Sequence, residues 1–125
     1  MPGKELNGRR VLVVEDEYML AMDMEQELRD AGATVLGPVP TVEEALALIE
    51  AERAVDGAVL DVNLAGEPIF PVADALLDRG VPLVLTTGYD PRAIPARYGG
   101  VPRCEKPVDM RAMLRTLADR VGASA

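Results

Sequence analysis

The chain of 125 residues carries 13 lysines and arginines against 21 aspartates and glutamates, a formal charge of −8 that argues against binding to DNA or to anionic lipid. It has no histidine and a single cysteine, Cys104, which excludes histidine-dependent catalysis, His-ligated zinc and an internal disulfide. Its length fits one domain, residues 1–125 with a core of about 10–121, and it has neither a signal-peptide stretch nor the ~20 apolar residues of a membrane span, so we expect a cytoplasmic protein.

Short aliphatic runs alternate along the chain with longer segments of helical period, the pattern of a parallel sheet covered by helices. In chain order we expect a strand at 10–15, a helix through 20–31, a strand at 34–37, a helix through 42–49, a strand at 57–61, a helix at 72–79, strands at 81–87 and 101–105, and a last helix through 110–121. Between the last two strands, Pro91 and Pro95 predict a fourth helix that is short, distorted or mobile.

Two helix starts are marked by capping residues. Thr41 and Glu44 have the S/T-x-x-E form, in which the side chains at both ends satisfy free backbone donors. Asp109 precedes the last helix as a cap, and Asp16 fits the same role at the first helix. Cys104 stands on an expected buried strand, where we interpret it as core packing without a redox role.

Polar residues stand at the carboxyl ends of four expected strands. Glu15 and Asp16 close the first strand, Asp61 the third and Thr87 the fourth, while Lys106 follows the fifth. In an open parallel sheet these ends meet at one edge, where ligands bind. Clustered carboxylates fit Mg²⁺, and a carboxylate nucleophile with a nearby lysine and hydroxyl fits transfer of a phosphoryl group.

Each of these residues also has a purely structural interpretation. Asp16 fits a helix cap, Asp61 a turn residue, Thr87 a core hydroxyl bonded to backbone, and Lys106 a solvated surface lysine. Taken singly, the structural interpretation is favoured at each position. The conjunction of four strand ends that all carry the residue type one reaction needs favours the chemical interpretation.

Four segments then carry a resemblance to a known family: 11–17 (VLVVEDE), 60–64 (LDVNL), 85–88 (LTTG) and 105–107 (EKP). With them the chain resembles the receiver domain of bacterial two-component response regulators over residues 10–121. The resemblance implies an α/β, flavodoxin-like (βα)₅ fold, a doubly wound five-stranded parallel sheet of order 2-1-3-4-5. It also implies a stand-alone signalling module that becomes a phosphoprotein, and not a classical enzyme.

The resemblance implies a metal site and a phosphoacceptor. Asp61 would accept the phosphoryl group, and Asp16 and Asp61 would ligate Mg²⁺ or Mn²⁺. Asn63 would offer its backbone carbonyl to the metal, and Glu15 would act through a water.

The remaining family roles fall on the fourth and fifth strand ends. Thr87 would bind the phosphoryl group and shift inward, and Lys106 would pair with a phosphoryl oxygen, next to a cis peptide bond at Pro107. Arg103 occupies the position where the family usually has its aromatic switch residue. We therefore expect Tyr89 and Arg103 to modify the usual switch.

The resemblance also implies the partners. The phosphoryl donor would be a sensor histidine kinase or a histidine phosphotransfer protein. Residues 87–89 resemble the end of the Phe-Ala-Thr-Gly-aromatic motif of one receiver subgroup, whose members are often paired with kinases of the HWE or a related type. A downstream protein would dock on the face of the fourth helix, fifth strand and last helix, with no nucleic acid or membrane involved.

Three other functions compete with this interpretation. A phosphatase of the haloacid-dehalogenase type wants a second acid two residues after its nucleophile, where this chain has Asn63. A nucleotide or flavin binder wants a glycine-rich loop, where residues 15–17 are all acidic. A pseudo-receiver, which keeps the fold without phosphorylation, stays open because of Arg103. The dimer state and the choice between activator and phosphate sink stay open too.

Overall fold

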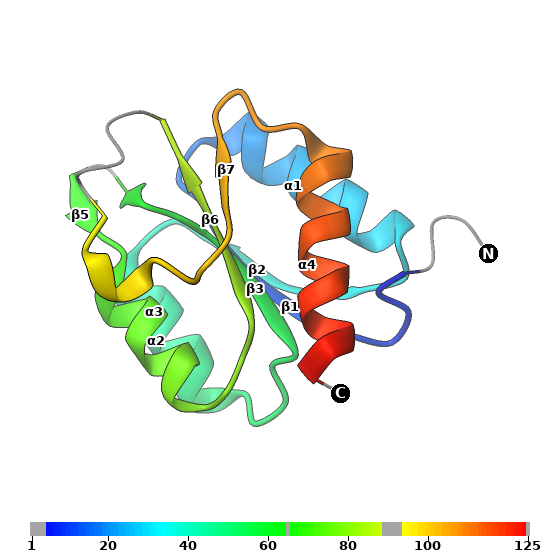
Figure 1. Cartoon of the computed structure of the whole chain (residues 1–125), viewed down its shortest axis with the longest axis horizontal. Coiled ribbons are helices and arrows are strands. Elements are labelled where there is room, and N and C mark those ends of the chain that lie inside the picture. Colours follow the sequence, from blue (N-terminus) through cyan, green and yellow to red (C-terminus); the bar gives the residue numbers. More distant parts are fainter. Residues whose placement is uncertain (1–4, 65, 89–93, 125) are drawn as a thin grey trace.

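The computed structural model describes residues 5–64, 66–88 and 94–124, and its centre is a five-stranded parallel sheet of order β2-β1-β3-β6-β7 (Figure 1). The strands are β1 (Arg10–Val14), β2 (Thr34–Val39), β3 (Gly57–Asp61), β6 (Leu83–Thr87) and β7 (Arg103–Glu105). Counted among these strands alone, the order is 2-1-3-4-5. The predicted doubly wound sheet is therefore confirmed.

In the described part of the chain, α-helices cover both faces of this sheet (Figure 1). Helices α1 (Tyr18–Asp30) and α4 (Met110–Ser124) lie on one face, and α2 (Val42–Ala51) and α3 (Phe70–Asp78) lie on the other. No helix among the described residues has the length and apolar character needed to cross a bilayer.

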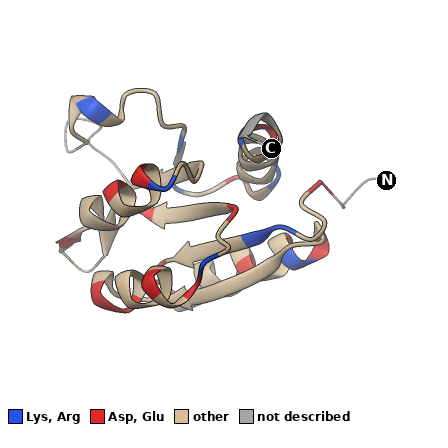
Figure 2. Cartoon of the chain, turned by 90° about the horizontal axis from the view of Figure 1, so that it is seen from below, with Lys and Arg blue, Asp and Glu red and all other residues tan. Residues whose placement is uncertain are grey.

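Alternate residues of each central strand pack into the two layers. In β1, Val11 and Val13 belong to the core beneath α1 and α4, whereas Leu12 and Val14 belong to the core beneath α2 and α3. Strands β3 and β6 repeat this alternation, so both faces of the central strands are buried, and the strands are apolar except at their ends. Within the five strands of the sheet, charged residues stand only at the ends (Figure 2).

Two strands begin later than predicted because a proline precedes each of them. Strand β6 begins at Leu83 rather than 81, and β7 begins at Arg103 rather than 101. Pro82 and Pro102 have no N–H to donate to a sheet, although their carbonyls accept hydrogen bonds from the neighbouring strands. The reverse correction applies to α3, which begins at residue 70 rather than 72 because proline is tolerated in a first helical turn.

Most of the predicted fourth helix, including Pro91, lies outside the described residues, so only its last part can be compared. In residues 94–102 the regular structure is one 3₁₀ turn, η2 (Ala96–Tyr98). Tyr98 is buried, its ring stacks on Phe70 of α3 with centroids 5.0 Å apart, and its hydroxyl donates to Asp74 of α3. The Arg97 guanidinium lies 4.5 Å from the centre of the Tyr98 ring. These contacts hold the described part of this segment against α3.

A short antiparallel pair, β4 (Asn63–Leu64) and β5 (Glu67–Pro68), follows β3 and was not predicted. Gly66 turns the chain with a φ of 88°, and its N–H donates to the Asn63 side chain at 3.1 Å. Strands of two residues carry no readable hydrophobic period, which is why the sequence gives no sign of this pair.

The helix caps agree with the sequence in part. The Ala112 N–H donates to Asp109 at 3.1 Å, which confirms the cap of α4. The Glu44 N–H donates to the Thr41 hydroxyl at 3.1 Å, but that hydroxyl in turn donates to the Glu44 carboxylate, so the return half of the capping box does not reach backbone. The structural alternative for Asp16 does not hold, because the residue before α1 is Glu17, and the Glu17 side chain makes no cap bond.

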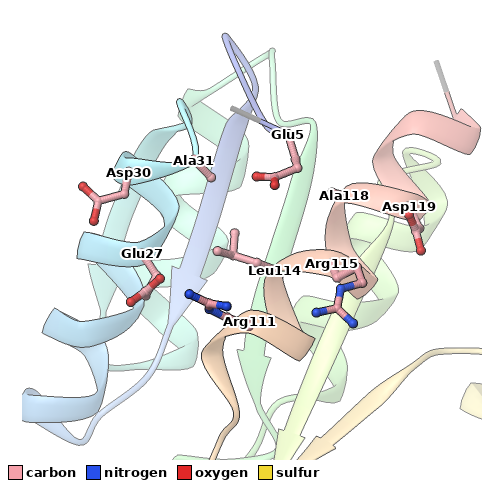
Figure 3. Close-up of a pocket in the computed structure, with 9 residues that line it drawn as sticks. All are labelled: Glu5, Glu27, Asp30, Ala31, Arg111, Leu114, Arg115, Ala118 and Asp119. Atoms are coloured by element: carbon pink, nitrogen blue, oxygen red, sulfur yellow. The ribbon is translucent and has the colours of Figure 1, made fainter. Parts of the chain in front are cut away.

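A hollow of about 420 Å³ lies between α1 and α4 (Figure 3). Its walls carry Glu27 and Asp30 on α1 and Arg111 and Arg115 on α4, with Leu114 between them. Glu5 and Asp119 also line it, so four acidic side chains and two arginines share the hollow and both signs of charge are present.

Candidate functional site at the strand ends

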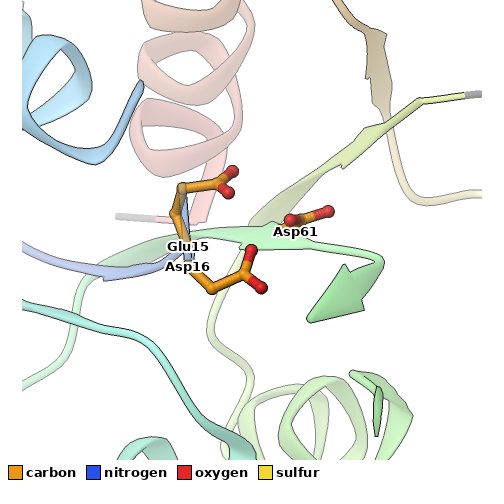
Figure 4. Close-up of side chains that lie close together, drawn as sticks. All are labelled: Glu15, Asp16 and Asp61. Carbon is orange, nitrogen blue, oxygen red and sulfur yellow. The ribbon is translucent and has the colours of Figure 1, made fainter. Parts of the chain in front are cut away.

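The acidic residues of the sequence come together because β1 and β3 are neighbours. Val14 pairs with Leu60 in parallel register, so Glu15 and Asp61 stand side by side at the ends of the two strands. Ligand oxygens of Glu15, Asp16 and Asp61 all lie within 4.8 Å of one another (Figure 4). This is the convergence that the strand ends predicted.

Two of the three carboxylates are buried. Glu15 and Asp61 expose 2% and 3% of their surface, while Asp16 is more exposed. Burial raises the pKa of Glu15 to about 7, and the neighbouring Asp61 charge adds to the rise. The Glu15 Oε1 atom accepts no hydrogen bond despite its burial. A nearby cation would stabilise the negative charge on this buried oxygen.

Lys106 supplies a cation to this cluster from the other end of the chain. Its Nζ lies 3.2 Å from Asp61 Oδ2, 3.2 Å from Glu17 Oε1 and 3.6 Å from Glu15 Oε1. Burial lowers the pKa of Lys106, but the Asp61 and Glu15 charges outweigh it and the pKa is raised, so the ammonium stays charged at neutral pH. The Lys106–Pro107 peptide bond is cis.

A cavity of about 1010 Å³ opens over these residues. Thr87 lines it at the end of β6, 7% exposed, beside Asp61 and Lys106. The Thr87 carbonyl accepts the Lys106 N–H at 2.8 Å, which fixes the two strand ends relative to each other. Carboxylate, hydroxyl and ammonium therefore face one space.

Asn63 also lines this cavity, and it forms hydrogen bonds with residues two and three positions away in the sequence. Its N–H donates to Asp61 Oδ1 at 3.1 Å. Arg103 is exposed on β7, does not line the cavity, and forms no ion pair with another described residue. Tyr89, the other expected switch modulator, lies outside the described residues.

The donor set fits a small hard cation. Three carboxylates offer only oxygen ligands, which suit Mg²⁺ or Mn²⁺ and do not favour metals that prefer nitrogen or sulfur. Glu15 Oε1 is buried without a hydrogen bond, although the Lys106 ammonium lies 3.6 Å away, so it has room to accept one from a water bound to such an ion. The residues present therefore fit the metal that the family resemblance implies.

Sequence reasoning missed two parts of the site. Glu17 contacts Lys106, and its place one residue after Asp16 was the only available signal. Phe70 forms part of the cavity wall, and no pattern pointed to it because α3 begins earlier than predicted.

No protein-family model matches the chain, but individual proteins and solved structures are similar to it. The transcriptional regulatory protein PdtaR of Mycobacterium tuberculosis is 29% identical over 90 residues, which cover 71% of this chain and 43% of PdtaR. This chain thus spans less than half the length of that curated relative. A response regulator receiver protein from Sinorhizobium medicae shares the fold, with a TM-score of 0.81 at 23% identity over 96% of this chain and 99% of that one.

SdrG from Sphingomonas melonis Fr1 is similar over nearly the whole of both chains. Its solution structure is 36% identical and has a TM-score of 0.78, covering 91% of this chain and 96% of SdrG. The BeF₃-activated conformation of SdrG has a TM-score of 0.73, with coverage of 97% and 99%.

Proposed function

This chain belongs to the receiver domains of response regulators, and on that premise we propose that it accepts a phosphoryl group on Asp61 in a Mg²⁺-dependent reaction and signals through altered protein contacts. One observation carries the proposal. The buried Asp61 carboxylate lies in a cavity with the Lys106 ammonium 3.2 Å away and two further carboxylates close by.

The donor in this proposal is a phosphohistidine of another protein, because this chain has no histidine. An Asp61 carboxylate oxygen attacks phosphorus and forms a P–O bond as the P–N bond to the imidazole breaks. The electron pair of that bond stays on the imidazole nitrogen, which takes up a proton from solvent. The products are an aspartyl phosphate and a neutral histidine.

Asp16 and Asp61 would hold Mg²⁺, with the Asn63 carbonyl as a further ligand and Glu15 acting through a water. When bound, the ion would neutralise charge on the phosphoryl oxygens. The acidic cluster needs this positive charge, because the three carboxylates alone would repel an anionic phosphoryl donor.

In the proposed reaction, the side chains of Lys106 and Thr87 also bind oxygens of the phosphoryl group. The Lys106 ammonium moves from Asp61 Oδ2 to a phosphoryl oxygen, and the Thr87 hydroxyl donates to another. In this proposal Thr87, at the end of β6, shifts inward on phosphorylation, and the fourth helix, β7 and α4 form the face offered to a downstream protein. The donor is a sensor histidine kinase, of the HWE type, or a histidine phosphotransfer protein.

Intact-mass spectrometry with Mg²⁺ and acetyl phosphate tests the proposal. We expect one added phosphoryl group in the wild type and none in Asp61→Asn or in excess EDTA. In parallel, beryllium fluoride with Mg²⁺ is expected to shift amide NMR signals at the ends of β3 and β6. A chain with neither the adduct nor those shifts would be a pseudo-receiver, and the proposal would be wrong.

A further inference from the structure

Glu17 shares the ammonium of Lys106 with the phosphoacceptor. The Nζ atom lies 3.2 Å from Glu17 Oε1 and 3.2 Å from Asp61 Oδ2. Asp61 is buried at the end of β3, whereas the Glu17 side chain is 60% exposed and lines the opening of the same cavity. One lysine is thus held between the buried acceptor and the solvent-exposed side of the site.

The backbone of Glu17 is fixed on both sides. Its N–H donates to Glu15 Oε2 at 3.0 Å, and its carbonyl accepts the Ala21 N–H at 2.9 Å in the first turn of α1. Although Glu17 stands at the cap position of α1, its carboxylate makes no cap bond. The carboxylate is therefore free of a role in the helix, and the contact it makes is with Lys106.

A phosphoryl group on Asp61 would change this division of charge. It places two to three negatively charged oxygens next to Lys106, and a bond from the ammonium to one of them stabilises the developing charge. Turning Nζ toward the phosphoryl group weakens its contact with Glu17. For an exposed ion pair such as this one, the loss corresponds to a rate effect of about two- to five-fold.

We propose that Glu17 is a positioning residue that holds Lys106 toward the opening of the cavity and thereby slows transfer of the phosphoryl group to Asp61. The inference rests on the proposed function and deepens it. Glu17 acts through Lys106 and does not itself touch the phosphoryl group. Glu17 therefore restrains the Lys106 ammonium, which the reaction needs next to the phosphoryl group.

The test compares initial rates of adduct formation from acetyl phosphate, by intact mass, in a double-mutant cycle. We expect Glu17→Gln to react about two- to five-fold faster than the wild type. Glu50→Gln, which removes the same charge from an exposed position on α2, is expected to react at the wild-type rate. In a Lys106→Met background, where every rate is lower, Glu17→Gln is expected to have no further effect.

Two results would overturn the inference while leaving the proposed function intact. One is an Asp61-dependent adduct that forms equally fast in Glu17→Gln and the wild type. The other is the same acceleration in the Lys106→Met background, which would assign the effect to charge at the opening rather than to the lysine. A wild type without any adduct would instead refute the proposed function itself.

Discussion

Neutralising Glu15 is expected to stabilise the metal-free protein, and to do so more strongly at alkaline than at acidic pH. The pKa of this buried carboxyl rises from 4.5 to about 7 on folding, which makes its ionisation in the folded state cost about 3 kcal/mol. Glutamine has nearly the same shape and carries no charge. Glu15→Gln should therefore remove most of that cost.

The change of stability with pH follows from the pH ranges in which the folded and the unfolded protein keep the Glu15 proton. Below about pH 4.5 the carboxyl is protonated in both states, and the Glu15 side chain carries no penalty. Between about 4.5 and 7 the unfolded chain loses the proton while the folded chain keeps it, so the stability of the wild type falls as pH rises. Above about pH 7 the full difference of about 3 kcal/mol remains.

Urea denaturation followed by circular dichroism, in EDTA at about pH 5 and about pH 8, measures this difference. Glu15→Gln should exceed the wild type by about 3 kcal/mol at the higher pH and by much less at the lower. Saturating Mg²⁺ should shrink the gap, because the ion stabilises the ionised wild-type cluster. A gap that does not widen with pH would refute the reasoning about burial, and Glu50→Gln provides a control for charge alone.

Three further changes act away from the site, each measured by urea denaturation against the wild type. Arg79→Met removes three hydrogen bonds from the guanidinium to backbone carbonyls at the end of α2 and should cost about 1–3 kcal/mol; an unchanged midpoint would mean that water replaces them. Tyr98→Phe keeps the stack on Phe70 but loses the hydroxyl bond to Asp74, at a cost of about 1 kcal/mol, and a neutral result would make that bond irrelevant to stability. Gly32→Ala should cost at least about 1 kcal/mol, since the residue has a φ of 95° and the new Cβ would lie 2.8 Å from a backbone atom; full stability would contradict that geometry.

The arrangement of the sheet was predictable because it depends on buried apolar runs, which are plain in the sequence. Val11 to Val14 already indicate a strand covered on both faces. The ends of elements were less predictable, since they depend on single residues such as Pro82 and Pro102 that remove a backbone donor. The β4–β5 pair is too short to leave a pattern at all.

The site was predictable to the extent that it sits at strand ends. Glu15, Asp61 and Thr87 are placed by the strands that precede them, so locating the strands locates the residues. Glu17 differs, because its role depends on where the Lys106 side chain reaches, and that contact joins residues 89 positions apart. No spacing within the sequence encodes such a contact.

The anchoring of Tyr98 to α3 has a consequence for how the surface of this protein changes. Phe70 lines the cavity at the strand ends and also stacks on Tyr98, while Asp74, one turn further along α3, accepts a hydrogen bond from the tyrosine hydroxyl. A displacement of residues 96–98 therefore pulls on α3, and a displacement of α3 pulls on residues 96–98. Residues 96–98 and α3 are thus joined by a ring stack and a hydrogen bond, and we expect a change in the position of one to move the other.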